Sequence, residues 1–319
     1  MCSGARVYRQ TNSSRVLERG PAPMRPAADG GPLGGYAASR PALPRRLGRP
    51  VKRGYRRVTS GRRVLPNALI IGAQKAGTSS VYEYLTRHPA VARASTKEVH
   101  FFDLAHSSGV GWYRRHFPTE TQVKRQRAET GLEPVVCEAT PYYLFHPQAP
   151  YRVRGSLGAA RLIVLLRDPV ERAISHYEHS VALGAEDLPF AEAIEREPER
   201  LAGEAERLAA DPCAASVPHR YHSYLSRGVY ADQLAVWLEL FPREQLLILS
   251  SHDLFRDPAA SMARVHEFLR LPPHALPAYP PYGQRGYAVD PALRERLRSY
   301  FAPHDERLWA LIDEEPCWR

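Results

Sequence analysis

Short apolar runs alternate with longer amphipathic segments along most of this chain, starting near residue 66. Four runs are rich in Val, Ile and Leu and are too short for helices, which is typical of strands buried in a parallel sheet. They lie at residues 67–73, 134–145 (ending in a loop), 161–169 and 245–250. Segments with helical spacing lie at 78–89, 231–242, 259–271 and 290–312. The alternation predicts an α/β fold of three layers, with a central parallel sheet flanked by helices.

Proline modifies two of the helical regions. The segment 290–312 contains Pro303, so we expect its helix to break there. Residues 184–217 are acidic, rich in Ala and punctuated by Pro, which predicts a helical insertion or lid among the regular elements.

The net charge of +10 is unevenly distributed. Residues 1–66 carry 15 Lys and Arg against 2 Asp and Glu, whereas the remainder carries 29 against 32. The N-terminal residues are also rich in Pro and Gly and lack apolar periodicity. We therefore expect a disordered basic arm over 1–65 and one folded domain over 66–319. A merely solvated arm and loose contact with a polyanion both fit this composition, without specific nucleic-acid binding.

The apolar runs are all shorter than the 18 or so residues that a membrane-spanning helix needs, and no signal-peptide pattern is evident. The cysteines have neither metal-site spacing nor the pattern of a compact disulfide framework; they are Cys2, Cys137, Cys213 and Cys317. These observations predict a cytoplasmic protein.

The stretch IIGAQKAGTSS at residues 70–80 resembles a nucleotide phosphate loop with one residue displaced. Gly72 and Gly77 keep the spacing of a Walker A loop, G-x-x-x-x-G-K-[ST], but Thr78 stands at the lysine position and Lys75 lies inside the loop. A glycine loop between a strand and a helix offers backbone N–H groups and the positive end of the helix dipole to a phosphate. The sequence therefore predicts a P-loop-like anion site.

A second anion site is predicted at the end of the run RLIVLLRDP. Arg167 there would repel a magnesium ion, so the site is not a Walker B carboxylate site. Arg167 and Ser175 lie across a predicted strand–helix junction and can both reach one phosphate, although Arg167 pairing only with Glu171, and Ser175 facing solvent, remain alternatives. Asp168 is a suitable helix cap, and Glu171 completes a pattern like a capping box. Two anion sites without a metal site fit a nucleotide bisphosphate better than ATP–Mg.

Five segments in order resemble the sulfotransferase family that uses 3′-phosphoadenosine-5′-phosphosulfate (PAPS), with the closest likeness to its heparan sulfate, glycan-type branch. They read PNALIIGAQKAGTSSVYEYLTRHP, KEVHFFD, GVGWYRRHFP, CEATPYYLF and LIVLLRDPVERAISHYEH, and the similarity covers roughly residues 66–319. The resemblance implies direct transfer of a sulfuryl group from PAPS to a hydroxyl, less readily an amine, of an acceptor. It implies no metal requirement and release of 3′-phosphoadenosine-5′-phosphate (PAP).

The resemblance also implies which residues bind the donor. The 5′-phosphosulfate loop would comprise Lys75, Ala76, Gly77, Thr78 and Ser79. Arg167 and Ser175 would hold the 3′-phosphate. A late loop would close over the donor through Gln284, Arg285, Gly286 and Tyr287. Lys75 would in addition stabilise charge that develops on the sulfuryl group and the leaving phosphate.

The segment KEVHFFD at 97–103 supplies the candidate base, because an attacking hydroxyl must lose its proton. We read this segment as a strand edge, in which Glu98 and His100 point to the same face. The resemblance implies Glu98 as the general base with His100 orienting it; histidine as the base, or as a structural residue, stays open. The following Phe101 and Phe102 are predicted to be core residues. Farther along the chain, His176 and His179 are predicted to lie on a helix surface.

Two departures from the heparan-type pattern concern the acceptor. A lysine of those relatives is replaced by Ala139 in the segment EAT, and no cysteine pair flanks residues 279–290. We therefore expect a soluble, bacterial-type enzyme that acts on a sugar or another small hydroxylated metabolite. The alternatives are a P-loop phosphotransferase or kinase, disfavoured by Thr78, and a non-catalytic polyanion-binding protein, disfavoured by Glu98 and Lys75 together.

Overall fold

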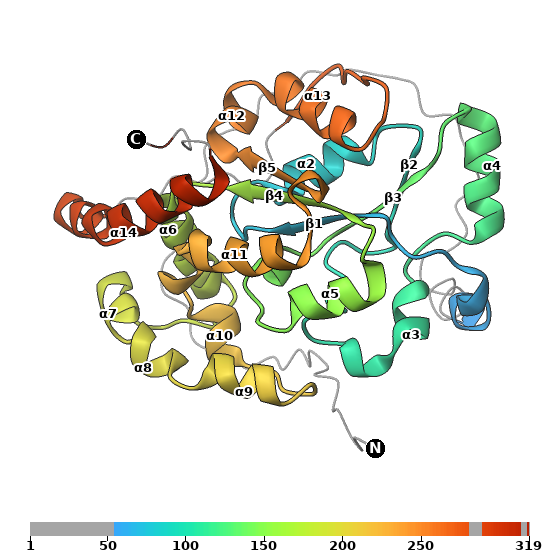
Figure 1. The fold of residues 1–319 in the computed structure, drawn as a ribbon. Helices are drawn as coiled ribbons and strands as arrows, with labels where there is room; N and C mark the ends of the chain where they lie inside the picture. The colour runs from blue at the N-terminus through green and yellow to red at the C-terminus, as the bar shows by residue number, and fades with distance from the viewer. Residues whose placement is uncertain (1–53, 281–288, 314–317, 319) are drawn as a thin grey trace, which may run out of the picture. The chain divides into compact units, whose positions relative to one another are not determined.

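A computed structural model describes residues 54–280, 289–313 and 318. Its centre is a five-stranded sheet in the order β2-β3-β1-β4-β5, and every pair of neighbouring strands is parallel (Figure 1). The strands are β1 (Ala68–Gly72), β2 (Val91–Arg93), β3 (Val135–Ala139), β4 (Arg161–Leu166) and β5 (Leu246–Ser250). The predicted parallel sheet is confirmed.

Helices cover both faces of this sheet, which confirms the three-layer prediction. Figure 1 shows α2, α12 and α13 on one face and α5 and α11 on the other. The α-helices are α2 (Thr78–Leu85), α3 (Val110–Arg114), α4 (Glu120–Thr130), α5 (Ala149–Leu157), α6 (Pro169–Ala182), α7 (Phe190–Glu195), α8 (Glu197–Leu201), α9 (Glu204–Ala210), α10 (Val217–Tyr221), α11 (Tyr230–Leu240), α12 (Ser251–Arg256), α13 (Pro258–Phe268) and α14 (Pro291–Ile312). Short 3-10 helices are η1 (Ser60–Arg62), η2 (His106–Ser108), η3 (Pro141–Leu144), η4 (Ser226–Gly228) and η5 (Arg243–Gln245).

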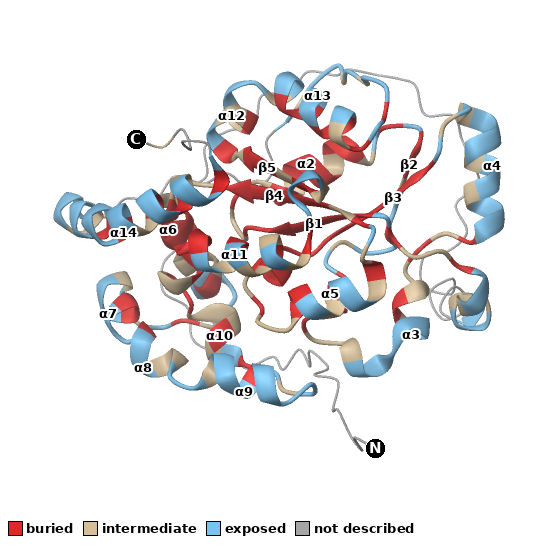
Figure 2. Ribbon diagram, in the orientation of Figure 1, coloured by how far each residue is buried: buried red, intermediate tan, exposed pale blue. Residues whose placement is uncertain are grey.

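The strands β1 and β3 are buried along their whole length, and Figure 2 shows the sheet as the most continuously buried part of the fold. Burial on both faces explains why these strands are apolar without alternation. Because parallel strands end at the same edge, the loops that follow β1, β3 and β4 meet there. This edge is where the predicted anion loops lie.

The predicted helical insertion is also confirmed, as the helices α7 to α10 between α6 and α11. Buried carboxylates fasten it to the segment before η4. Glu197 accepts hydrogen bonds from the backbone N–H groups of Leu225 (2.6 Å) and Ser226 (2.8 Å). The insertion is therefore fastened to the rest of the domain and is not a loose surface loop.

Two expectations about the ends of the domain were wrong. The helix α14 continues through Pro303 without a break. Buried residues anchor the helix on both sides of the proline: Leu297 and Phe301 before it pack in the smaller apolar cluster, and Leu308 after it packs in the main core. At the other end, Arg63 is buried and donates to the carbonyl oxygen of Phe117, so residues 54–65 belong to the folded unit and not to the arm.

Among the described residues, no helix combines the length and apolarity needed to cross a membrane.

Candidate active site

The first half of the candidate site is the loop between β1 and α2. Gly77 is the N-cap of α2, has φ of 96°, and provides no side chain to cap the helix. A Cβ atom there would lie 3.0 Å from Leu254 Cδ2 and 3.1 Å from Phe255 Cζ, so the close approach also favours glycine. The first N–H groups of a helix lack partners within the helix, so an uncapped N-terminus is suited to an anion.

Neighbouring strands and helices hold this loop in place. The backbone N–H of Ala73 donates to Leu165 O at 2.7 Å, and the Ser251 hydroxyl donates to the carbonyl oxygen of Ala76. The guanidinium of Arg167 donates to the carbonyl oxygen of Lys75 at 3.0 Å. The loop is therefore fixed from the β4 and β5 sides before any ligand arrives.

The second predicted anion site adjoins the loop, as its Arg167 contact requires. Arg167 Nη2 lies 3.9 Å from Glu171 Oε2, but Glu171 is in direct contact with Arg294, so a simple Arg167–Glu171 pair does not describe the site. Asp168 caps α6 as predicted, accepting from Val170 N at 2.8 Å, whereas Glu171 does not complete a capping box. Ser175 is buried on α6, so the alternative of a solvent-facing serine was wrong.

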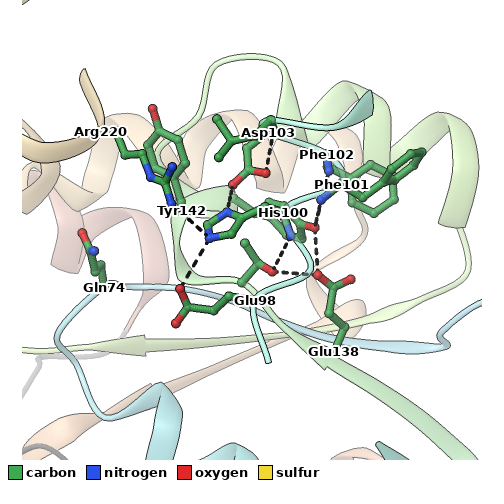
Figure 3. A network of polar contacts seen from close by, with 12 residues as sticks. Gln74, Glu98, His100, Phe101, Phe102, Asp103, Glu138, Tyr142 and Arg220 are labelled. Atoms are coloured by element: carbon green, nitrogen blue, oxygen red, sulfur yellow. Dashed lines mark hydrogen bonds and ion pairs between the residues drawn. The ribbon is translucent and has the colours of Figure 1, made fainter. Parts of the chain in front are cut away.

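The second half of the site is the segment 97–103, and it is not the strand edge that we predicted. Glu98 has φ of 58° and His100 has φ of 54°, so the backbone turns at both residues. The turns still bring the two side chains together, with His100 Nε2 3.5 Å from Glu98 Oε2 (Figure 3). The predicted pairing holds, but the extended geometry that we used to predict it was wrong.

The end of β3 and the helix η3 provide hydrogen-bond acceptors for this segment in place of a strand neighbour. The N–H of Glu98 donates to Ala139 O at 2.9 Å, and the N–H of Phe101 donates to the Tyr143 hydroxyl oxygen at 2.9 Å. The N–H of Phe102 lies 3.4 Å from the same oxygen. Side-chain acceptors allow a turned backbone, whereas a strand ladder would have kept it extended. Both phenylalanines are buried, as predicted.

Glu138 lies beneath these contacts and is fully buried. It accepts hydrogen bonds from the hydroxyl groups of Thr140 (2.7 Å), Tyr143 (2.8 Å) and Tyr113. Burial raises the pKa of this carboxyl, and the three hydroxyl donors oppose the shift. The carboxyl thus fixes the tyrosine that in turn holds the backbone of Phe101 and Phe102.

The charges around His100 decide which group can act as a base. Burial would lower the pKa of His100, but Asp103, whose Oδ2 lies 2.6 Å from Nδ1, and Glu98 raise it to about 9. Arg220 Nη2 lies 3.5 Å from His100 Nε2, and its positive charge lowers the pKa of His100. The two carboxylates, of which that of Asp103 is fully buried, have the larger effect on this pKa. At neutral pH His100 is therefore an imidazolium, which has no lone pair to accept a proton.

Glu98 is ionised over the same pH range. Burial alone would raise its pKa, but the hydrogen bond from His100 and the charge and hydrogen bond of Lys97 lower it to about 2. Lys97 Nζ lies 2.8 Å from Glu98 Oε1 and 2.9 Å from Ser79 Oγ. The base candidate and the anion loop are thus joined through one lysine.

The backbone of the described residues marks the same positions independently. Five non-glycine residues have positive φ, and two of them, Arg270 and Asp313, follow helix ends. The other three are Lys75, Glu98 and His100. Left-handed backbone at non-glycine residues is costly and gathers at functional sites. These three are the residues to which the sequence analysis assigned the chemistry.

Comparisons with known proteins agree with this geometry. The sequence model described as the sulfotransferase domain matches residues 65–278. The chain belongs to the sulfotransferase domain family. A crystal structure of a sulfotransferase from Alicyclobacillus acidocaldarius shares the fold, with 31% identity and a TM-score of 0.60, covering 79% of this chain and 97% of that one. The resemblance seen in the sequence is confirmed.

Two curated proteins of this sulfotransferase family are similar over the domain. Human heparan sulfate glucosamine 3-O-sulfotransferase 3B1 is 35% identical over 212 residues, 66% of this chain and 48% of the human protein. Mouse heparan sulfate glucosamine 3-O-sulfotransferase 5 is 28% identical over 280 residues, 80% of this chain and 74% of the mouse protein. The chain thus spans about half the length of the human relative.

Sequence reasoning missed three charged residues of this sulfotransferase site. Asp103 stands three positions after His100 within KEVHFFD, and a carboxylate so close to a candidate catalytic histidine was a usable signal. Lys97 begins the same segment and was likewise visible. Arg220 reaches His100 from α10 of the insertion, and nothing in its own neighbourhood in the sequence indicated this.

Other predicted positions have different outcomes. His176 is fully buried against Tyr224, with ring centroids 5.1 Å apart, so its assignment to a helix surface was wrong; the segment around Tyr224 covers that face of α6. His179 is partly buried.

The late-loop residues lie outside the described residues: Gln284, Arg285, Gly286 and Tyr287. Within the described ranges, no group of three or more His, Cys, Asp or Glu is arranged to hold a metal ion.

Proposed function

We propose that this protein transfers a sulfuryl group from PAPS to a hydroxyl group of a sugar or another small hydroxylated acceptor. One observation carries the proposal: Lys97 donates hydrogen bonds both to the carboxylate of Glu98 and to the hydroxyl of Ser79 in the anion loop. Glu98 is ionised and has a left-handed backbone conformation. A base and an anion cradle in contact are what a direct transfer to a hydroxyl needs, since deprotonation and departure of the phosphate occur in one place.

The residues of the β1–α2 loop fit the phosphosulfate end of the donor. The uncapped N-terminus of α2 would hold phosphate oxygens, with Thr78 and Ser79 in its first turn. Lys75 would stabilise negative charge at the transferred group. Arg167 and Ser175 would hold the 3′-phosphate beside it. When bound, PAPS supplies an activated sulfuryl group whose bond to phosphate breaks as the acceptor oxygen bonds to sulfur.

Glu98 is the general base in this proposal and takes the acceptor proton. At neutral pH the two neighbouring carboxylates stabilise the protonated form of His100. This supports a role of His100 in positioning Glu98 and argues against His100 as the general base. Asp103 fixes the imidazolium from the side opposite Glu98. This arrangement keeps the Glu98 carboxylate oriented while leaving Glu98 partly exposed to an incoming acceptor.

The acceptor is proposed at the level of its class. The names of the two curated relatives concern glucosamine of heparan sulfate. In this chain Ala139 is buried, and its carbonyl oxygen accepts a hydrogen bond from the N–H of Glu98. A glycan or a small hydroxylated metabolite fits a site whose base lies at an open edge of the sheet. A cytoplasmic location remains a prediction from composition.

The test is sulfuryl transfer from labelled PAPS to a panel of sugars and small alcohols. We expect turnover by the wild type and a loss of roughly 10²–10⁴-fold in Glu98→Gln. Glu83→Gln, which removes a carboxylate from a surface pair with Arg93, is the matched control and should be unaffected. Equal turnover in the wild type and Glu98→Gln would overturn the base assignment. ATP hydrolysis without PAP binding would indicate a phosphotransferase instead.

A further inference from the structure

Lys97 links two parts of the proposed site: the loop between β1 and α2, called the donor loop below, and the segment 97–103, called the base segment. Its ammonium group donates to Ser79 Oγ at 2.9 Å and to Glu98 Oε1 at 2.8 Å, and its side chain is only 25% exposed. The two acceptors belong to different halves of the site. One is the first turn of α2, which faces the predicted phosphosulfate, and the other is the base.

The two halves make competing demands on this ammonium group. In the free protein, the Glu98 carboxylate is its anionic neighbour, and Ser79 offers only a neutral hydroxyl. A phosphosulfate at the N-terminus of α2 would add negative charge within reach of the same ammonium, because Ser79 lies in the first turn of that helix. A lysine ammonium on a flexible stem can change partners, since it is a point charge with three rotatable donors.

We propose that Lys97 couples donor binding to the base. It holds Glu98 in an ion pair in the free protein and turns toward the phosphosulfate group when the loop is filled, which releases Glu98 to accept a proton. The inference rests on the proposed function, because it assigns the donor site to the loop and the base to Glu98. Lys97 is a positioning residue in this account, acting through Glu98 and Ser79.

The release matters because Glu98 is a weak base while paired. A carboxylate whose pKa lies near 2 has little tendency to take a proton, and removal of a neighbouring cation raises that pKa. The other charged or titratable groups that face Glu98 are His100 on its own segment and His179 on α6. Asp103 and Arg220 face His100. Of these groups, only Lys97 also contacts the donor loop through a hydrogen bond to Ser79.

The experiment is a double-mutant cycle on PAP binding, measured by calorimetry, so that turnover is not needed. Lys97→Gln should weaken PAP binding about tenfold, the effect of losing roughly 1.4 kcal/mol of interaction. Glu98→Gln should tighten it several-fold, because Lys97 no longer has to leave an ion pair. The double variant should bind like Lys97→Gln, because Glu98 influences PAP only through Lys97.

Two further variants keep the outcome interpretable. Lys124→Gln removes one positive charge from the exposed face of α4 and should leave PAP affinity unchanged. Lys97→Arg keeps the charge and should retain most of the affinity, which separates the charge effect from a folding defect. The coupling is overturned if Lys97→Gln binds PAP as the wild type does, or if the gain from Glu98→Gln persists in the Lys97→Gln background. Full turnover in Glu98→Gln would instead remove the base assignment while leaving the binding cycle unaffected.

Discussion

The two loops that form this site contain the same unusual backbone but are held in different ways. In the β1–α2 loop, Lys75 has φ of 71° and is followed by Gly77 at the helix start. In the segment 97–103, Glu98 and His100 have left-handed backbone and no glycine beside them. The first loop is specified locally, by a glycine and a helix N-terminus. The second depends on acceptors from β3 and η3, about forty positions away in the sequence.

The comparison teaches that the two loops have separate structural supports in this fold. The donor loop is fixed from the β4 and β5 sides, through Leu165, Arg167 and Ser251. The base segment is fixed from the β3 side, through Ala139 and Tyr143. Lys97 joins the two. Changes in one loop should therefore lower donor affinity, and changes behind the other should lower turnover with little effect on donor affinity.

After Glu98→Gln, the largest expected effect belongs to the donor loop. Lys75→Ala should reduce kcat by roughly 10²–10³-fold, the usual loss when a preorganised charge at the reacting group is removed. It should also weaken PAP binding, because the ammonium group acts on the bound and the reacting states alike. Steady-state kinetics with PAPS and calorimetry with PAP measure the two losses. A drop in kcat with unchanged PAP affinity would show that Lys75 acts on turnover alone, as expected for residues behind the base segment, and would contradict the comparison.

The same contrast explains which parts of the site were predictable from the sequence. The donor loop was predicted because its determinants are local: a buried run, glycines at fixed spacing, and a helix that follows. The geometry of 97–103 was not predicted, because the side chains that accept hydrogen bonds from its turned backbone lie about forty positions away in the sequence. They are Thr140, whose Oγ1 lies 3.5 Å from His100 N, and Tyr143, whose hydroxyl oxygen lies 2.9 Å from Phe101 N. Residue identity still predicted that the side chains of Glu98 and His100 lie together, although the assumed strand was wrong.

The error about the burial of His176 has a related cause. His176 lies on α6, and Tyr224, from the segment before η4, packs against its ring. The sequence predicted that an insertion exists but not which face it covers. Arg220 was missed for the same reason, since it comes from that insertion. The sheet and most of its helices, by contrast, follow from apolar periodicity within single segments.

A second, smaller effect belongs to the base segment and depends on pH. Asp103→Asn should lower the free energy of unfolding by about 2–3 kcal/mol at pH 6, as a charge-assisted hydrogen bond is lost. Because the pKa of His100 is raised, the ion pair contributes its full stability below pH 6.5, the usual pKa of histidine. This contribution is lost as the pH rises through about 9, the pKa of His100 in the folded protein. Urea unfolding should therefore show that the difference in free energy of unfolding between wild type and Asp103→Asn is smaller at pH 10 than at pH 6.

The control for that variant is Asp187→Asn, an exposed acid on the insertion. It should have little effect at either pH. Asparagine at position 103 keeps an oxygen for the N–H of Leu104, which donates to Asp103 Oδ1 at 2.7 Å, so this hydrogen bond is retained while the negative charge beside the imidazolium is lost. A destabilisation that is equal at pH 6 and pH 10 would contradict the assigned charge of His100. PAP affinity should stay close to that of the wild type, in contrast to Lys75→Ala.

The smallest effect tests the support behind the base segment. Tyr143→Phe removes the oxygen that accepts from Phe101 N and donates to Glu138, and should cost about 1–2 kcal/mol of stability. Turnover should fall several-fold while PAP affinity is unchanged, because the β1–α2 loop has its own anchors. Tyr151→Phe, at an exposed position on α5, is the matched control. A Tyr143→Phe variant that loses PAP affinity in step with turnover would show that the support behind Glu98 and His100 also fixes the β1–α2 loop, and would contradict the separate supports.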